Sequence, residues 1–305
     1  MYRKIGAEFL NEDNTKFTVW APSQENVEVI IKGKEKSEKL QKDKHGYWEG
    51  TISNTPPGTL YKFKLNNKNE FPDPASRSQP EGVHSWSQVV DQNAFKWEEK
   101  SWKGISIKDM VIYELHVGTF TSEGTFKAVT EKLDHLLELG INTIEILPIS
   151  QFPENRNWGY DGVYPYAAQH SYGGVEGLKK MINTCHQKGI AVILDAVYNH
   201  MGPEGNYLSQ YGPYFTEKYK TPWGAALNYD DKHSDEVRNF FIQNVLMWLE
   251  EFRFDGLRLD AIHEIIDRGA RHLLKEMSQK VDGLQEKTVR GNMCSLQKVI
   301  LMTLK

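Results

Sequence analysis

Cysteine is scarce in this chain of 305 residues, which contains only Cys185 and Cys294. Two thiols cannot build the disulfide framework on which small secreted domains depend. We therefore expect a fold held together by its hydrophobic core, in the reducing environment of the cytoplasm.

Long apolar runs and an excess of basic charge are also missing. No stretch approaches the roughly 18 apolar residues that a membrane span needs, and residues 1–6 contain no long apolar segment of a signal peptide. Lysine and arginine number 37 against 41 acidic residues, a net charge of −4. We expect neither a membrane nor nucleic acid as a partner.

Aromatic residues, in contrast, are abundant: 8 Trp, 14 Tyr and 13 Phe. Such rings fill hydrophobic cores, and they also form the stacking platforms of sugar-binding clefts. Composition leaves both uses open, and the length of the chain allows two domains.

The first 98 residues have the pattern of an all-β domain. Alternating apolar residues predict strands over residues 16–20, 27–31, 46–52 and 60–65. Short strands at regular spacing, separated by turns, are typical of an immunoglobulin-like β-sandwich. We predict such a domain over residues 1–98, followed by a linker over residues 99–108.

The pattern changes after the linker, and residues 109–288 alternate between strands and helices. Strands are predicted over residues 111–117, 143–148, 191–196 and 256–260. Helices are predicted over residues 126–139, from Val175 to just before Gly189, and from an N-cap at Ser234 to Phe252. This order predicts a parallel sheet that amounts to the first half of a (β/α)8 barrel, with a flavodoxin-like open sheet as the alternative.

Polar residues gather where two of these strands end. Asp260 ends one strand two residues after Arg258, and Asp195, Asn199 and His200 end or follow another. The carboxyl ends of parallel strands carry the active sites of barrel enzymes. An arginine beside Asp260 would keep this carboxylate ionised and able to attack as a nucleophile. The arrangement favours the barrel and a sugar hydrolase.

These segments resemble the signatures of the α-amylase superfamily of glycoside hydrolases. Residues 195–200 resemble its first signature, residues 256–260 its second, and residues 1–98 the starch-binding-type module that precedes branching and debranching enzymes. Within the superfamily, residues 1–288 are most similar to the malto-oligosyltrehalose trehalohydrolase family. The segments that carry this similarity are residues 71–77, 79–84, 159–162, 221–224 and 260–263.

The resemblance implies a role for each matching residue. Asp260 would be the nucleophile that forms a covalent glycosyl-enzyme, and Arg258 would orient it. Asp195 would brace Arg258, a structural rather than a chemical task. His200 would bond a hydroxyl of the sugar being cleaved, and Tyr160 would stack on its ring.

Other positions are implied less directly. Asp161 would lie near the same sugar, and His263 would contact the next glucose unless it is an ordinary surface histidine. Trp223 would line the cleft or pack in the core, and Tyr214 is a weaker candidate for lining the cleft. Asn199 is expected to cap a turn, with calcium binding as the alternative.

The activity implied is a retaining double displacement at the α-1,4-glucosidic bond next to the terminal trehalose of malto-oligosyl trehalose. No cofactor and no metal are expected, and the oligomeric state is open. Three rivals remain: a 1,4-α-glucan branching enzyme, a non-catalytic fragment that binds α-glucan, and a gene product without function.

A second carboxyl group, which a retaining glycosidase needs as its acid/base, is not evident. The superfamily carries this glutamate on a fifth strand, in a segment like Phe-Ile-Ala-Glu-Ser-Asp, but residues 289–305 contain no acidic residue. Glu264 follows Asp260 too closely and is not expected to replace it.

Back-translation of residues 294–305 with permitted codons, shifted by two nucleotides, yields the missing segment. We interpret the tail as out of frame from about residue 288, with a natural terminal strand as the alternative. We expect a half barrel whose fourth strand has an unpaired edge, which is unstable without the sandwich and does not hydrolyse the substrate. The sandwich is expected to fold alone.

Overall fold

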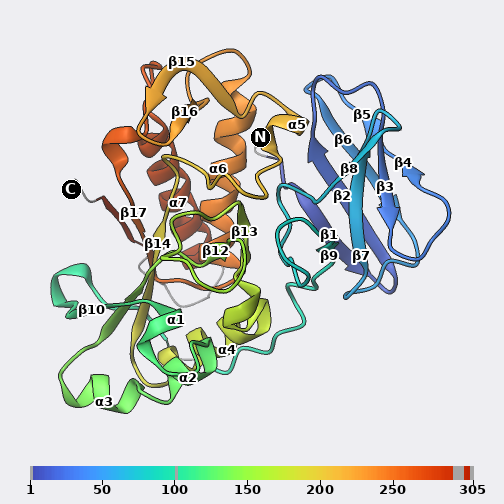
Figure 1. Cartoon of the computed structure of the whole chain (residues 1–305). Helices are drawn as coiled ribbons and strands as arrows, with labels where there is room; N and C mark the ends of the chain where they lie inside the picture. The colour runs from blue at the N-terminus through green and yellow to red at the C-terminus, as the bar shows by residue number, and fades with distance from the viewer. Residues whose placement is uncertain (1–2, 100–101, 291–298, 303–305) are drawn as a thin grey trace.

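The computed structural model describes residues 3–99, 102–290 and 299–302, with side chains described as far as Leu284. The chain forms two parts that lie side by side (Figure 1). The N-terminal part is built of strands, and the C-terminal part alternates strands and helices.

The N-terminal part is a sandwich of two antiparallel sheets. One sheet has the order β1 (Gly6–Asn11), β2 (Asn14–Trp20), β6 (Tyr47–Ile52) and β5 (Gln41–Lys42). The other has the order β4 (Glu38–Lys39), β3 (Val27–Ile31), β7 (Leu60–Leu65) and β8 (Asn69–Phe71), and β9 (Ser87–Gln88) also pairs with β7. Phe17 and Tyr61 join the sheets, with ring centroids 4.9 Å apart. The predicted strands and sandwich are confirmed.

The C-terminal part contains a parallel sheet. Its strands are β10 (Ile112–Leu115), β11 (Thr143–Ile146), β14 (Ala191–Ala196), β17 (Gly256–Leu259) and β18 (Val299–Met302), in this order. The α-helices are α1 (Val117–Phe120), α2 (Phe126–Thr130), α3 (Leu133–Glu138), α4 (Gly174–Gln187), α5 (Leu208–Tyr211), α6 (Ser234–Glu250) and α7 (Leu273–Arg290). Two small hairpins, β12 (Ser150–Gln151) with β13 (Tyr164–Ala168) and β15 (Phe215–Thr221) with β16 (Gly224–Leu227), extend from it, and the 3-10 helices are η1 (Ile107–Asp109), η2 (His170–Tyr172) and η3 (Ile262–Glu264).

Two helix predictions need correction. The helix predicted over residues 126–139 is split into α2 and α3, because the amide of Glu131 bonds the carbonyl three residues back and closes the first helix as a turn. Ser234 is not an N-cap but the first residue of α6. His233, in a left-handed conformation with φ of 67°, occupies the cap, and the Ser234 amide donates to the carbonyl of Asp231.

The expected unpaired edge of the fourth strand is wrong. β17 pairs with β18 in parallel, with Gly256 opposite Val299 and Leu259 opposite Met302. These four residues of the tail therefore form a fifth strand of the sheet, and the interpretation of the tail as out of frame stays a prediction. The other residues of the tail beyond Arg290, 291–298 and 303–305, lie outside the described part of the chain.

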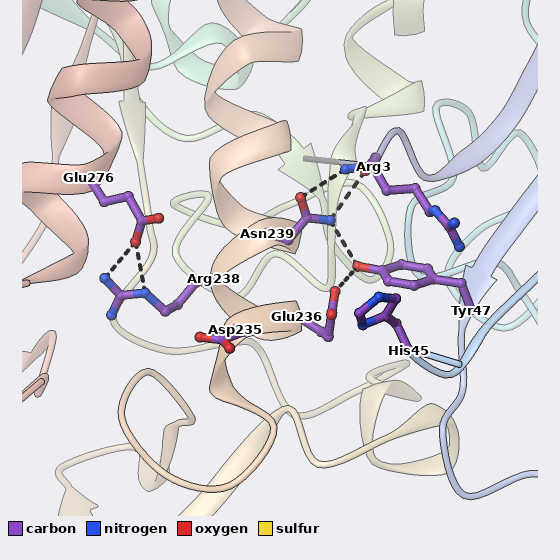
Figure 2. A pocket seen from close by; sticks show the side chains of 8 residues that line it. All are labelled: Arg3, His45, Tyr47, Asp235, Glu236, Arg238, Asn239 and Glu276. Carbon is purple, nitrogen blue, oxygen red and sulfur yellow. Dashed lines mark hydrogen bonds and ion pairs between the residues drawn. The ribbon is translucent and has the colours of Figure 1, made fainter. Parts of the chain in front are cut away.

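The two parts share one hydrophobic core. Trp20 of the sandwich packs edge-on against Tyr214, with centroids 5.2 Å apart, and the Tyr211 hydroxyl donates to the carbonyl of Pro72 at 2.8 Å. A further junction is a pocket of about 550 Å³. Figure 2 shows the Tyr47 hydroxyl in this pocket between Glu236 and Asn239 of α6. The sandwich is therefore fixed against the segment between β14 and α6.

Across the described ranges, none of the helices combines the length and apolar character needed to cross a bilayer.

Candidate active site

The predicted centre of the site is assembled by neighbouring strands. Asp195 of β14 and Arg258 of β17 are direct partners in the parallel ladder. Nη1 of Arg258 lies 2.8 Å from both carboxylate oxygens of Asp195 and 2.8 Å from Oδ1 of Asp260. One guanidinium thus links the two carboxylates that the sequence placed at adjacent strand ends.

Burial distinguishes these two acids. The side chain of Asp195 is fully buried, whereas that of Asp260 is 18% exposed. Burial raises the pKa of Asp195 to about 6, although hydrogen bonds from Arg258 and Tyr160 oppose the rise. Burial would lower the pKa of Arg258, but its hydrogen bonds to Asp195 outweigh this and raise it. Asp195 therefore anchors the cation, and Asp260 is the carboxylate that a ligand can reach.

Tyr160 and His200 extend this network. The Tyr160 hydroxyl donates to Oδ2 of Asp195 at 3.0 Å, and Nε2 of His200 lies 2.9 Å from the Tyr160 carbonyl oxygen. Burial lowers the pKa of His200. A carbonyl oxygen can only accept, so Nε2 carries the proton, and Nδ1 of the neutral ring is a buried acceptor with no partner among the described residues.

The backbone before Tyr160 depends on Gly159. This residue has φ of +99°, and a Cβ at this position would lie 2.0 Å from the carbonyl oxygen of Pro148. Only glycine fits this close approach, which turns the chain so that Tyr160 reaches Asp195.

Trp223 lies over His200. The two rings are stacked, with centroids 4.3 Å apart and planes 7° apart, and Trp223 remains 49% exposed. Packing in the core, the alternative for Trp223, is therefore wrong, because its ring lies at the surface beside the site.

Two predicted residues lie outside this hydrogen-bonded group. The carboxylate of Asp161 is exposed and accepts from Nδ2 of Asn157 at 2.7 Å. His263 lies on η3 with 44% of its side chain exposed, and Nε2 is 4.0 Å from Glu264.

Two other expectations are wrong. Tyr214 is 2% exposed and packs between Trp20 and Phe240, so it belongs to the junction with the sandwich and not to the cleft. Asn199 is 1% exposed, and neither atom of its side-chain amide has a partner in the described part of the chain. Asn199 therefore does not cap a turn.

A neighbouring pocket was missed by the sequence analysis. It has a volume of about 500 Å³ and is lined by His116, Thr119, Arg156 and Trp158, among others. Trp158 is 68% exposed, and its ring lies 5.5 Å from that of His116. The sequence did contain a signal for this pocket. His116 directly follows β10, just as His200 follows the end of β14.

Two family models match the chain. The model described as "Alpha amylase, catalytic domain" matches residues 69–224, about half of the chain. The model described as "Carbohydrate-binding module 48 (Isoamylase N-terminal domain)" matches residues 4–94.

Curated relatives agree with these matches. The chain is 52% identical over 272 residues to the malto-oligosyltrehalose trehalohydrolase of Saccharolobus solfataricus, covering 89% of this chain and 48% of the relative. It is 42% identical over 274 residues to that of Arthrobacter ramosus, covering 89% and 48%. It is 31% identical to the 1,4-alpha-glucan branching enzyme GlgB of Salinibacter ruber, covering 88% and 47%. The chain thus spans about half the length of the curated relatives it matches.

Among solved structures, a putative alpha amylase from Salmonella typhimurium is similar, with a TM-score of 0.89 and 39% identity, covering 98% of this chain and 49% of that one. A pullulanase from Anoxybacillus complexed with maltotriose has a TM-score of 0.81 and 25% identity, covering 98% and 48%. The ladder of β14 and β17 and these matches lead to one conclusion: the chain belongs to the α-amylase catalytic-domain family, with a carbohydrate-binding module 48 at its N-terminal end.

Proposed function

We propose that this chain carries the nucleophile half of a retaining glycoside hydrolase site. Its substrate would be malto-oligosyl trehalose, cleaved at the α-1,4-glucosidic bond next to the terminal trehalose. The observation that carries the proposal is the contact of Arg258 with both Asp195 and Asp260, which leaves the more accessible carboxylate free to attack a sugar. The identity to trehalohydrolases, higher than to the branching enzyme, supports this substrate.

Each surrounding residue has a proposed task. Arg258 orients Asp260, and Asp195 holds Arg258 in place from the neighbouring strand. Tyr160 stacks on the sugar being cleaved, and His200 bonds one of its hydroxyl groups. Trp223, stacked on His200, would cover that sugar.

Asp161 and His263 complete the proposed set. Asp161 would bond the same sugar, and His263, half exposed on η3, would contact the adjoining glucose of the substrate.

The proposed mechanism gives Asp260 a step that can be isolated. The carboxylate attacks the anomeric carbon, the bond from this carbon to the leaving group breaks, and a covalent glycosyl-enzyme forms. A sugar leaving group must receive a proton from an acid, whereas fluoride leaves without one. An activated glycosyl fluoride therefore tests the nucleophile in the absence of an acid/base.

The experiment incubates the 305-residue chain with a 5-fluoro derivative of α-maltotriosyl fluoride and examines it by mass spectrometry. We expect one covalent sugar adduct on the peptide that contains Asp260. The variant Asp260→Ala should remain unmodified, and Asp134→Asn, an exposed acid far along the chain, should behave like the parent chain. An adduct on another peptide, or none at all, would refute the assignment of the nucleophile.

The natural substrate should give a different result. None of the residues described above is placed to act as the acid/base, so we expect the chain to release no trehalose from maltotriosyl trehalose. Chromatography of the reaction products measures this release. Trehalose release by the 305-residue chain would contradict this expectation. Transfer of glucan segments would favour the branching-enzyme alternative, and retention on amylose without either reaction would favour a glucan-binding role of the sandwich.

We also propose that the protein acts in the cytoplasm, in the synthesis of trehalose. The support is its use of cysteine, since Cys185 is a buried free thiol. Fractionation of the source cells would test this, and recovery of the protein from the culture medium would contradict it.

A further inference from the structure

Trp223 is held at the tip of a hairpin that has few buried residues. β15 and β16 pair through Thr216 with Ala226 and Lys220 with Ala225, so residues 217–219 form a bulge on β15. Most of the hairpin is exposed or half-buried. Bulges kink a strand and re-aim the residues beyond them. The position of Trp223 over His200 therefore depends on what fixes this bulge.

Asp230 binds two residues of the bulge. Its side chain is 2% exposed, and Oδ1 lies 3.1 Å from Nζ of Lys218. Oδ2 accepts from the hydroxyl of Tyr219 at 2.7 Å. The next residue, Asp231, also contributes: its Oδ2 accepts a hydrogen bond from Oγ1 of Thr216 at 3.1 Å, directly before the bulge. Two consecutive acids thus bind the strand that leads to Trp223.

The same carboxylate also contacts the loop that follows η3. Oδ2 of Asp230 also accepts from the backbone amide of Arg268 at 2.9 Å, and the guanidinium of Arg268 lies 5.4 Å from the Tyr219 ring centroid. Arg268 belongs to the loop between η3, which carries His263, and α7.

That loop is itself fixed to the barrel half. The neighbouring carboxylate of Asp267 accepts from the guanidinium of Arg238 on α6 and from the backbone amide of Leu273. The loop is thus fixed to the barrel half, and its hydrogen bond with Asp230 connects the hairpin to it.

The geometry points to Asp230 as a positioning residue that locks the Trp223 hairpin to the loop after the nucleophile strand, so that the two walls of the cleft keep one arrangement. The inference rests on the proposed function only in calling this space a cleft. Asp230 touches no reacting atom, and its effect would pass through Trp223 and its stack on His200.

A test without sugar separates this inference from the proposed function. Selective ¹³C labelling at Cε1 of histidine reports the ring current of Trp223 on His200, and Trp223→Ala defines its complete loss. In Asp230→Asn we expect His200 to lose most of this ring-current shift, because a neutral amide binds Lys218, Tyr219 and Arg268 less firmly. Glu217→Gln, which removes an exposed charge on the same bulge, should leave the spectrum unchanged.

Two further variants keep the test decisive. Tyr219→Phe removes one hydrogen bond to Asp230, so a partial loss of the shift is expected even if Asp230→Asn fails to fold. Asp230→Glu, which retains the charge, should restore part of the shift relative to Asp230→Asn. A parent-like His200 resonance in Asp230→Asn and Tyr219→Phe would overturn the proposal, whatever happens with the glycosyl fluoride.

Discussion

Arg258 is the residue on which the chemistry of the proposed site depends. It contacts Asp195 and Asp260 with a single guanidinium nitrogen, and its side chain is 6% exposed. A cation shared by two carboxylates cannot be removed without leaving buried negative charge unpaired.

We expect Arg258→Lys to form the Asp260 adduct roughly 100-fold more slowly, since the lysine side chain is one bond shorter than the reach of Nη1 and the loss of one or two charge-assisted hydrogen bonds costs about 1.5–3 kcal/mol each. The rate is measured by mass spectrometry with the fluorinated maltotriosyl fluoride. Arg271→Lys, an exchange at an exposed arginine, is the control. Equal rates for the two variants would remove Arg258 from the mechanism.

Asp73 makes stability depend on pH. It is fully buried in the turn after β8, and burial raises its pKa to about 6 even though the Tyr61 hydroxyl and the Ala75 amide donate to it. An unfolded aspartate titrates near 3.9, so the folded state binds the proton more tightly. The resulting stability is present below about pH 4 and is lost as the pH rises through about 6.

Asp73→Asn should remove this dependence. Between pH 4 and pH 7, the free energy of unfolding should fall by about 2–3 kcal/mol less in the variant than in the parent chain, because the amide never ionises. Urea unfolding at a series of pH values measures the difference. Asp195 titrates in the same window in both proteins and cancels in the comparison. Identical pH profiles would contradict the assignment.

Among the elements, the segment between β14 and α6 contacts the sandwich through Tyr211 and Tyr214. Gly212 follows α5 in an extended conformation, and a Cβ there would lie 2.9 Å from Cζ3 of Trp20 and 3.1 Å from Cδ of Pro22. Space, and not backbone strain, requires glycine at this position.

We therefore expect Gly212→Ala to lower the free energy of unfolding by about 1–3 kcal/mol through overpacking against Trp20. Gly283→Ala provides the matched control, since Gly283 lies within α7 with open space around its Cα, and alanine there should raise stability by about 0.5–1 kcal/mol. Both values come from urea denaturation. A neutral Gly212→Ala would mean that α5 and the sandwich can separate at little cost.

The elements also show how far sequence could lead. Apolar periodicity identified β10, β11, β14 and β17, and the parallel ladder then brought Asp195 and Arg258 together, as their places at strand ends implied. Apolar periodicity could not predict the burial of Asn199 or Tyr214, because this burial depends on segments far away in sequence. The stack of Trp223 on His200 depends on the bulge in β15, and the pairing shift that makes it leaves no apolar pattern.

The expectation of an unpaired edge failed for a different reason. Residues 299–302 pair with β17, because their apolar run suits a strand whether or not the segment is in frame. Local pattern specifies what a segment can form, whereas its partner strand determines what it does form.

At the scale of the whole molecule, the described sheet has an edge strand at each end, β10 and β18. β10 pairs only with β11 among the described strands, and Val111, Ile112 and Tyr113 are 50%, 41% and 37% exposed. An exposed apolar edge is a site for aggregation. We therefore expect the stability of the barrel half to depend on its contact with the sandwich.

We expect the two parts to unfold together. Trp20, 2% exposed, packs against Tyr214, and the same core cluster continues from the sandwich into the barrel half. Trp20→Ala should lower the free energy of unfolding by about 3–5 kcal/mol, by the same amount in both parts.

Hydrogen exchange in increasing urea, detected by mass spectrometry, measures this directly. Peptides from β2 and β6 are compared with peptides from β14 and β17. One shared midpoint, shifted equally by the variant, is expected because neither part can lose the shared interface alone. A sandwich that keeps its protection after the barrel peptides have exchanged would show instead that it folds alone, as its sequence by itself suggested.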